Sequence, residues 1–235
     1  FVSDASHELR TPVTVILGYS DLLARWGRSD AKILEEGITS IRSEAEDMQD
    51  LIEKLLFLAR ADQKRQILHK DFVHLDELVD DAVRKMKLVA KEHTVQIAVN
   101  EPGIIYADPA TMRQMMRIFL ENAVKYTPAG GHIAVSSRRL PEKGCMELTF
   151  ADDGIGIAQE DKDKIFERFY RADSARTKKA DSIGGTGLGL SIASWIAEQH
   201  EIEIAVESEL DKGTKFILTI PLAEDDESDT SDKEG

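Results

Sequence analysis

His7 is the residue whose type and setting most clearly allow covalent chemistry. It lies in the segment Ser6-His7-Glu8-Leu9-Arg10-Thr11-Pro12. At roughly 100° per residue along a helix, His7 and Thr11 fall about 160° and 200° from Leu9, on the side away from the apolar face. A neutral imidazole is a nucleophile, and Glu8 beside it could orient the ring or take its proton. A lone histidine more often has a structural role, but an outward position leaves this one accessible to a nucleotide held by another domain.

A second set of polar residues lies in the run Glu121-Asn122-Ala123-Val124-Lys125-Tyr126-Thr127-Pro128. The sequence predicts a helix that Asp108-Pro109 opens and that ends near Tyr126. Asn122 is therefore in mid-helix, where asparagine is mildly unfavourable, and this suggests a functional reason for it. Its amide oxygen is a suitable ligand for Mg²⁺, and Lys125, one turn away, can meet phosphate charge. The alternative interpretation is a polar cluster at the surface.

Asp152 has the properties of a residue that selects a nucleotide base. It ends an apolar run that is predicted to be a strand, and it begins the segment Asp152-Asp153-Gly154-Ile155-Gly156-Ile157. An ionised carboxylate only accepts hydrogen bonds. It would therefore bind the exocyclic amino group of adenine and repel the carbonyl that guanine has there. Gly154 and Gly156 would let the backbone approach the base and adopt φ > 0. A lone motif of this kind is also common as an ordinary β-turn.

The run Gly184-Gly185-Thr186-Gly187-Leu188-Gly189-Leu190 precedes a helix predicted near 187–200. Its amides and the helix N-terminus suit a phosphate group. It is not a Walker A loop, because no Gly-Lys-Ser/Thr follows. The preceding residues, 158–183, read as a long polar loop that includes the aromatic anchors Phe166, Phe169 and Tyr170 and the arginines Arg168 and Arg171. The arginines either contact phosphate or are solvated.

Two long helices are predicted over residues 1–62, joined near Trp26–Asp30. In the second helix, apolar residues repeat at spacings that alternate between four and three, namely Leu34, Ile38, Ile41, Ala45, Met48, Ile52, Leu55 and Ala59. This heptad seam cannot be buried by one hairpin, so we expect a dimer that forms a four-helix bundle.

The remaining sequence predicts a linker, a second domain and a tail. Residues 63–71 are polar, and residues 72–222 mix helices with largely antiparallel strands, which predicts an α+β sandwich. Strands are expected at 72–74, 94–100, 132–139, 145–152, 202–208 and 214–220, with an apolar run at 104–107 and helices at 75–92 and 109–126. Residues 223–235 hold seven acidic residues and one lysine, so we expect a disordered tail.

Composition and charge exclude several classes of function. The net charge of −14 argues against a nucleic-acid binder. Cys145 is the single cysteine, which excludes an intrachain disulfide and a cysteine-based zinc site. No apolar run approaches the roughly 18–20 residues that span a membrane. The chain begins without a methionine and inside a helical pattern, so we expect a fragment with further sequence upstream.

Together these motifs resemble those of the sensor histidine kinases of two-component systems, whose H, N, G1, F and G2 boxes occur in this order. The resemblance covers the chain except its acidic tail. It implies a homodimer through the hairpin and an ATP-binding domain of the type shared with gyrase and mismatch-repair ATPases. It also implies ATP and Mg²⁺ as cofactors, and transfer of the phosphoryl group from His7 to an aspartate in a response-regulator receiver domain. This portion would be cytoplasmic and connected to the cell membrane only through upstream sequence.

The resemblance also implies individual roles. Glu8 corresponds to the general base, and Thr11 to the residue that orients a hydrolytic water when the partner is dephosphorylated. The implied nucleotide contacts are Asn122, Lys125, Tyr126, Asp152, Gly154, Gly156, Arg171, Gly185, Gly187, Leu188 and Gly189, with Asn122 also the Mg²⁺ ligand. Many relatives have a second asparagine where this chain has Ile118. That contact is absent or is supplied by another group, such as Glu121.

Two other functions remain as alternatives. A non-catalytic scaffold that responds to ATP would fail to incorporate phosphate. A clamp ATPase related to chaperone and repair proteins would release free phosphate and retain no label on the protein.

Overall fold

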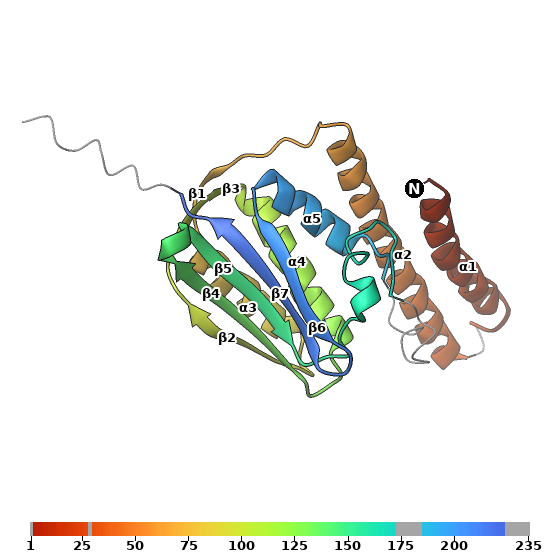
Figure 1. The fold of residues 1–235 in the computed structure, drawn as a ribbon. Coiled ribbons are helices and arrows are strands. Elements are labelled where there is room, and N and C mark those ends of the chain that lie inside the picture. The colour runs from red at the N-terminus through yellow and green to blue at the C-terminus, as the bar shows by residue number, and fades with distance from the viewer. Residues whose placement is uncertain (1, 28–29, 173–184, 224–235) are drawn as a thin grey trace, which may run out of the picture. The chain divides into compact units, whose positions relative to one another are not determined.

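The computed structural model describes residues 2–27, 30–172 and 185–223 (Figure 1). The predicted acidic tail beyond residue 223, and much of the predicted loop 158–183, lie outside the described residues. The chain divides into two compact units. One holds the residues up to Gln66 together with Glu167–Arg171 and the described part of Gly184–Ile192, and the other holds the remaining described residues.

The first unit is built on the predicted helical hairpin. Helix α1 (Val2–Trp26) and helix α2 (Ala31–Asp62) lie side by side (Figure 1). The Asp30 side chain caps α2 by accepting hydrogen bonds from the N–H groups of Lys32 and Ile33, at 2.9 and 3.3 Å. The helices approach closely at Gly37, where a Cβ atom would lie 2.7 Å from the side chain of Leu23.

The predicted heptad seam of α2 stays largely open in this single hairpin. Leu34, Ile38 and Ile52 are 42%, 55% and 43% exposed. The buried residues of α2 instead fall on another stripe, with Leu51 and Leu58 one heptad apart. One hairpin therefore leaves an apolar stripe uncovered, and the dimer that would cover it stays a prediction.

The second unit contains a five-stranded sheet and a separate two-stranded sheet. The larger sheet has the order β2 (Thr94–Asn100), β4 (His132–Leu140), β5 (Cys145–Asp152), β7 (Gly213–Pro221) and β6 (Glu203–Glu209). β1 (Asp71–His74) pairs antiparallel with β3 (Ile104–Ala107). The expected antiparallel pairing holds except between β2 and β4, which are parallel. They can be parallel because β3 and a helix, α4, form the crossover between them.

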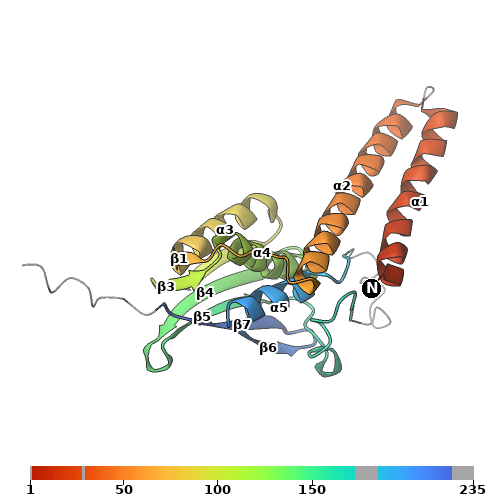
Figure 2. The same cartoon turned by 90° about the horizontal axis from the view of Figure 1, so that it is seen from above.

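Helices α3 (Leu75–Val89) and α4 (Pro109–Tyr126) cover one face of the larger sheet (Figure 2). Phe119 of α4 contacts Phe150 and Phe216 of the sheet, with ring centroids 5.3 and 4.9 Å apart. This aromatic cluster lies in the core of the predicted sandwich, which the structure confirms.

Two predicted helix boundaries differ from those observed. Helix α3 ends at Val89 rather than at residue 92, because Lys91 and Glu92 lie in a turn whose end is fixed by the His93 Nε2 contact with the Thr127 carbonyl oxygen, at 2.9 Å. Helix α5 (Gly189–Gln199) begins two residues later than predicted, because Gly187 has φ +66, which a right-handed helix excludes. Short 3₁₀ helices occur at Pro141–Lys143 and Gln159–Asp161.

Candidate functional site

His7 is exposed on α1, as the helical periodicity predicts. Among the described residues, none donates to or accepts from its imidazole. Glu8 is half-buried beside it, and Thr11 is exposed one turn later. Pro12 is buried inside α1, and the helix continues through it to Trp26. The structure therefore presents an accessible imidazole with a carboxylate next to it in sequence.

Asn122 is half-buried in the last turns of α4. Its side-chain amide makes no hydrogen bond to the part of the chain that the structure describes, so its oxygen is available to a ligand. Lys125 Nζ lies 4.9 Å from the ring centroid of Tyr126, a distance typical of a cation–π contact. Ile118, one turn before Asn122, is 5% exposed and belongs to the core. The Glu121 carboxylate lies 3.8 Å from Arg117.

The end of α4 is bonded directly to the glycine segment that follows β5. The carbonyl oxygen of Tyr126 accepts from the N–H of Ile155 at 3.1 Å. A Cβ atom on Gly154 would lie 2.4 Å from that same carbonyl oxygen. Gly154 is thus required for a close approach between two protein segments, and it is absent from the glycines with positive φ, contrary to expectation. Gly156 has the expected positive φ, +70.

Asp152 is the last residue of β5, and its two carboxylate oxygens differ in their hydrogen bonding. Oδ1 accepts from the N–H of Gly154 at 2.9 Å and from the N–H of Thr214 at 3.2 Å. No described residue donates to Oδ2. Burial raises the pKa of Asp152, the two N–H bonds oppose that rise, and the charge of Asp153 adds to it. The side chain is fixed through one oxygen while the other remains an open acceptor.

Asp153 is not equivalent to its neighbour. Its Oδ1 accepts from the backbone N–H of His132 at 2.7 Å, and its Oδ2 lies 3.0 Å from Nδ1 of the same residue. The bond from the His132 N–H lowers the pKa of Asp153, with the His132 ring contributing further. Both oxygens are engaged on β4, so Asp152 is the carboxylate that can receive a ligand.

The hairpin between β6 and β7, to which no sequence motif pointed, completes the surroundings of Asp152. Gly213 has φ +98, and a Cβ there would lie 1.9 Å from the carbonyl oxygen of Asp152. A Cβ on Gly156 would lie 2.0 Å from the carbonyl oxygen of Glu209. Thr214 contacts Asp152 directly, and the hydroxyl of Ser208 bonds to Thr214. The one sequence feature that could have pointed to this hairpin is the pair Gly213-Thr214, which follows a turn.

The glycines before α5 belong to the first unit. Gly187, with φ +66, accepts at its carbonyl oxygen from the N–H of Phe169 at 3.0 Å. A Cβ on Gly187 would lie 2.7 Å from the carbonyl carbon of Phe169, so the predicted aromatic anchor contacts the glycine run. Leu188 is fully buried, and Gly189 is the first residue of α5. Gly185 is exposed.

The two predicted phosphate-binding arginines are placed differently. Arg171 is exposed. Arg168 donates to both carboxylate oxygens of Asp62, at 2.7 and 2.5 Å, and this bond lowers the pKa of Asp62. For Arg168, the structure therefore shows an ion pair instead of a free guanidinium.

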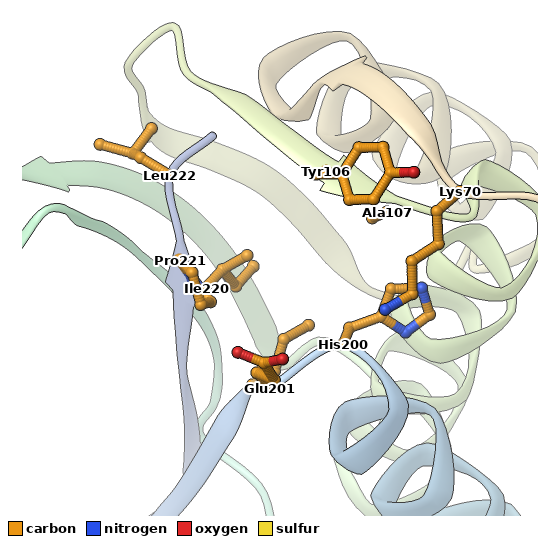
Figure 3. Close-up of a pocket in the computed structure, with 9 residues that line it drawn as sticks. Lys70, Tyr106, Ala107, His200, Glu201, Ile220, Pro221 and Leu222 are labelled. Atoms are coloured by element: carbon orange, nitrogen blue, oxygen red, sulfur yellow. The ribbon is translucent and has the colours of Figure 1, made fainter. Parts of the chain in front are cut away.

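One cavity of the second unit is lined by none of these residues (Figure 3). Lys70, Tyr106, His200 and Ile220 are among the side chains around it. Thr214 pairs with Asp152, and Pro221 at the cavity lies seven positions further along β7, or about 23 Å of strand. The cavity contains none of the predicted site residues, and we assign it no part in the chemistry.

The cavity wall is held by buried and part-buried polar contacts. Lys70 Nζ donates to the carbonyl oxygen of Gln199 at 2.6 Å. His200 Nε2 accepts from the N–H of Asp108 at 3.0 Å, so its Nδ1 carries the proton and donates to the carbonyl oxygen of Ile196 at 2.7 Å. Burial lowers the pKa of His200. Both ring nitrogens are used, which marks a structural histidine.

Comparison with known proteins identifies both units. Residues 107–224 match the family model described as histidine kinase-, DNA gyrase B- and HSP90-like ATPase. Residues 1–64 match the His Kinase A (phospho-acceptor) domain. No described helix is long and apolar enough to cross a membrane.

Similar sequences and structures carry related names. The chain is 40% identical over 218 residues to the sensor histidine kinase YkoH of Bacillus subtilis (strain 168), covering 93% of this chain and 46% of that protein. It is 36% identical over 217 residues to the signal transduction histidine-protein kinase ArlS of Staphylococcus aureus (strain USA300), covering 92% and 47%. The chain thus spans about half the length of these relatives.

Among solved structures, the histidine kinase AdeS of Acinetobacter baumannii has a similar fold. Its TM-score is 0.70 at 20% identity, over 92% of this chain and 98% of that one. Full-length ShkA in complex with AMPPNP gives a TM-score of 0.67 at 27% identity, over 93% and 44%.

Proposed function

Because this chain belongs to the sensor histidine kinases of two-component systems, we propose that it transfers the γ-phosphoryl group of ATP to its own His7. It then passes that group to an aspartate in the receiver domain of a response regulator. The observation that carries the proposal is the exposed imidazole of His7, which no described residue engages.

In the first step, a bond forms between an imidazole nitrogen and the γ-phosphorus, and the bond from that phosphorus to the β–γ bridging oxygen breaks. ADP leaves with the electron pair of the broken bond. The proton on the other ring nitrogen passes to Glu8, the carboxylate next in sequence. In the second step, a carboxylate oxygen of the partner displaces the imidazole from phosphorus. Two bond exchanges thus carry the phosphoryl group from nucleotide to partner.

The second unit fits the nucleotide at two places. No described residue donates to Asp152 Oδ2, so this oxygen suits the exocyclic amine of adenine. The amide oxygen of Asn122, which likewise has no partner among the described residues, suits Mg²⁺. With Ile118 in the core and Glu121 paired to Arg117, we propose that one amide, rather than two, serves the metal. Mg²⁺ would neutralise developing charge on the phosphates.

In the first unit, the N-terminus of α5 and the amides of the preceding glycines suit the phosphates. Leu188 is buried, so it would position these amides through packing rather than contact the nucleotide with its side chain. Arg168 is paired with Asp62, and Arg171 is exposed. We assign phosphate contact to Arg171 because it is the position that the family resemblance implies.

The partner-directed activity rests on the outer face of α1. Thr11 lies one turn from His7 and is exposed, so its hydroxyl could hold a water against a phosphorylated receiver domain. We propose that the protein also dephosphorylates its partner and that it works as a homodimer through the open stripe of α2. We further propose a cytoplasmic location for these residues, with the membrane reached through sequence outside this chain.

The test is incubation with γ-labelled ATP and Mg²⁺, followed by acid and alkali treatment, since phosphohistidine is acid-labile. We expect acid-labile label on the native protein and none on His7→Gln, which should still bind ATP. His74→Gln is the matched control, because His74 is also exposed and makes no side-chain cap bond to α3. Native-level labelling of His7→Gln would contradict the assignment of His7 as the phosphorylated residue. Release of free phosphate without labelled protein would favour a clamp ATPase.

A further inference from the structure

The hydroxyl of Ser208 joins the two segments that surround Asp152. Ser208 lies on β6, and its Oγ accepts from the N–H of Ile157 at 2.8 Å. The same Oγ lies 2.9 Å from the carbonyl oxygen of Gly213, to which it donates, and 2.9 Å from Oγ1 of Thr214. A serine hydroxyl has one proton and two lone pairs. Three hydrogen bonds therefore use its whole capacity.

This saturation fixes the direction of the bond between the two hydroxyls. The proton of Ser208 is donated to Gly213, so the proton between Ser208 and Thr214 belongs to Thr214. Thr214 Oγ1 can then only accept hydrogen bonds from other groups. Because Thr214 is the cross-strand partner of Asp152, the two side chains project from the same face of the sheet, with Cβ atoms about 5 Å apart.

We propose that Ser208 is a positioning residue for base selection. This inference rests on the proposed binding of ATP beside Asp152. By taking the proton of Thr214, Ser208 leaves that end of the pocket with acceptors, Asp152 Oδ2 and Thr214 Oγ1, and without a hydroxyl donor. Adenine has an exocyclic amine with two N–H donors at the corresponding position, and guanine has a carbonyl acceptor. Ser208 thus strengthens the preference for adenine without touching the base.

Ser208 also holds the glycine segment in place. The segment is bonded at Gly154 N–H to Asp152, at the Ile155 carbonyl oxygen to the N–H of Asp211 at 2.9 Å, and at Ile157 N–H to Ser208. Asp152 and Ser208 supply the side-chain bonds among these three, so removing the Ser208 hydroxyl frees one end of the segment.

The variant Ser208→Ala removes the acceptor of the Thr214 proton. The Thr214 hydroxyl can then rotate and donate toward the base, which favours guanine and disfavours adenine. We expect the ratio of ATP to GTP affinity to fall about five- to tenfold, the equivalent of one net hydrogen bond. Ser208→Thr keeps a hydroxyl at this position and should restore the ratio.

The matched control is Ser137→Ala. Ser137 lies on β4 of the same sheet and is fully buried, and its Oγ has no hydrogen-bond partner among the described residues. This change removes a buried serine hydroxyl without altering the surroundings of Asp152, so it should leave the ratio unchanged. A loss that Ser137→Ala shares with Ser208→Ala would identify a general effect on the sheet and overturn the proposal.

A second variant addresses the case in which Ser208→Ala does not fold. Thr214→Val keeps the shape of Thr214 and removes the hydroxyl whose direction Ser208 sets. It should lower the ATP preference by a similar factor. In the double variant with Ser208→Ala, the two losses should not add, because both act through one hydroxyl.

The measurement is titration calorimetry with ATP and with GTP in the presence of Mg²⁺, on the full chain. Selective ATP binding by the native protein, with a reduced ratio in Ser208→Ala and in Thr214→Val, is the expected result. Selective binding by the native protein with unchanged ratios in both variants overturns the role of Ser208 and leaves the proposed function standing. No ATP binding by the native protein overturns the proposed function itself, and this inference with it.

Discussion

The substitution Asp152→Asn should reverse the hydrogen-bonding character of the pocket as well as weaken it. Oδ1 of Asp152 accepts two backbone N–H groups, from Gly154 and Thr214. An asparagine at this position has to place its carbonyl oxygen there, because an NH₂ group would meet two donors. The NH₂ group then takes the place of Oδ2 and faces the base. A donor thus replaces the acceptor that adenine needs.

The magnitude follows from the bond that is lost. A hydrogen bond to a charged group contributes about 1.5–3 kcal/mol, which corresponds to a loss of about ten- to 150-fold in ATP affinity. GTP affinity should rise or stay the same, because the guanine carbonyl can accept from the new NH₂ group. The ratio of the two affinities is therefore the sensitive quantity.

Stability provides an independent check on the same variant. Burial raises the pKa of Asp152 above its unfolded value, so the folded protein holds a charge there at a cost. Removing that charge should not lower the thermal unfolding midpoint of the ligand-free protein near neutral pH. Acidification should act like the substitution, since protonation makes Oδ2 a donor. ATP affinity should therefore fall at a pH where an ordinary surface aspartate is still ionised.

The assay is calorimetric titration of ATP and GTP into Asp152→Asn and into Asp153→Asn, the matched control. Asp153 is the neighbouring carboxylate, but both of its oxygens are engaged by His132. Its amide variant should keep the native nucleotide preference. An unchanged ATP/GTP ratio in Asp152→Asn, or an equal drop in both variants, would refute the assignment of Asp152 to the base.

Three further predictions concern other parts of the molecule. The free energy of unfolding should fall as pH drops below 6.5, because burial lowers the pKa of His200 in the folded state and the unfolded state binds the proton more readily. Chemical denaturation at several pH values should show that the free energy of unfolding of His200→Gln depends less on pH than that of the native protein. Ile38→Asp places a charge in the open stripe of α2, so light scattering should show a monomer that still binds ATP, and a persistent dimer would contradict the seam. Thr11→Ala should reduce dephosphorylation of the partner much more than autophosphorylation, measured on one preparation; parallel loss of both would instead indicate that Thr11 shapes the helix at Pro12.

Local sequence signals predicted much of the fold. Asp108-Pro109 carries both an N-cap and an N1 proline, and α4 begins and ends where the sequence placed it. The alternation of apolar and polar residues, together with a high apolar content, correctly predicted the bounds of β2 and β5. The parallel pairing of β2 with β4 was not predicted, because side-chain periodicity is the same in parallel and antiparallel strands.

The candidate site was predictable in residue type but less so in arrangement. The acidic pair 152–153 was visible in the sequence, but the difference between its members depends on His132, some twenty residues earlier. Ser208 and Thr214 join the site through strand pairing with β5 and β7, which no local pattern encodes. The dimer seam and the roles of His7, Glu8 and Thr11 stay predictions, since a single chain without its partner does not test them.

The tight packing at Gly213 predicts how substitutions at this position would behave in a mutational scan. A Cβ at this position would lie 1.9 Å from the carbonyl oxygen of Asp152, closer than two non-bonded atoms can come, and its φ of +98 already disfavours any side chain. Every replacement must push β5 and β7 apart beside Asp152. In a scan that measures nucleotide binding, replacements of Gly213 should therefore cause losses close to those of Asp152, although glycine has no side chain with which to bind a ligand.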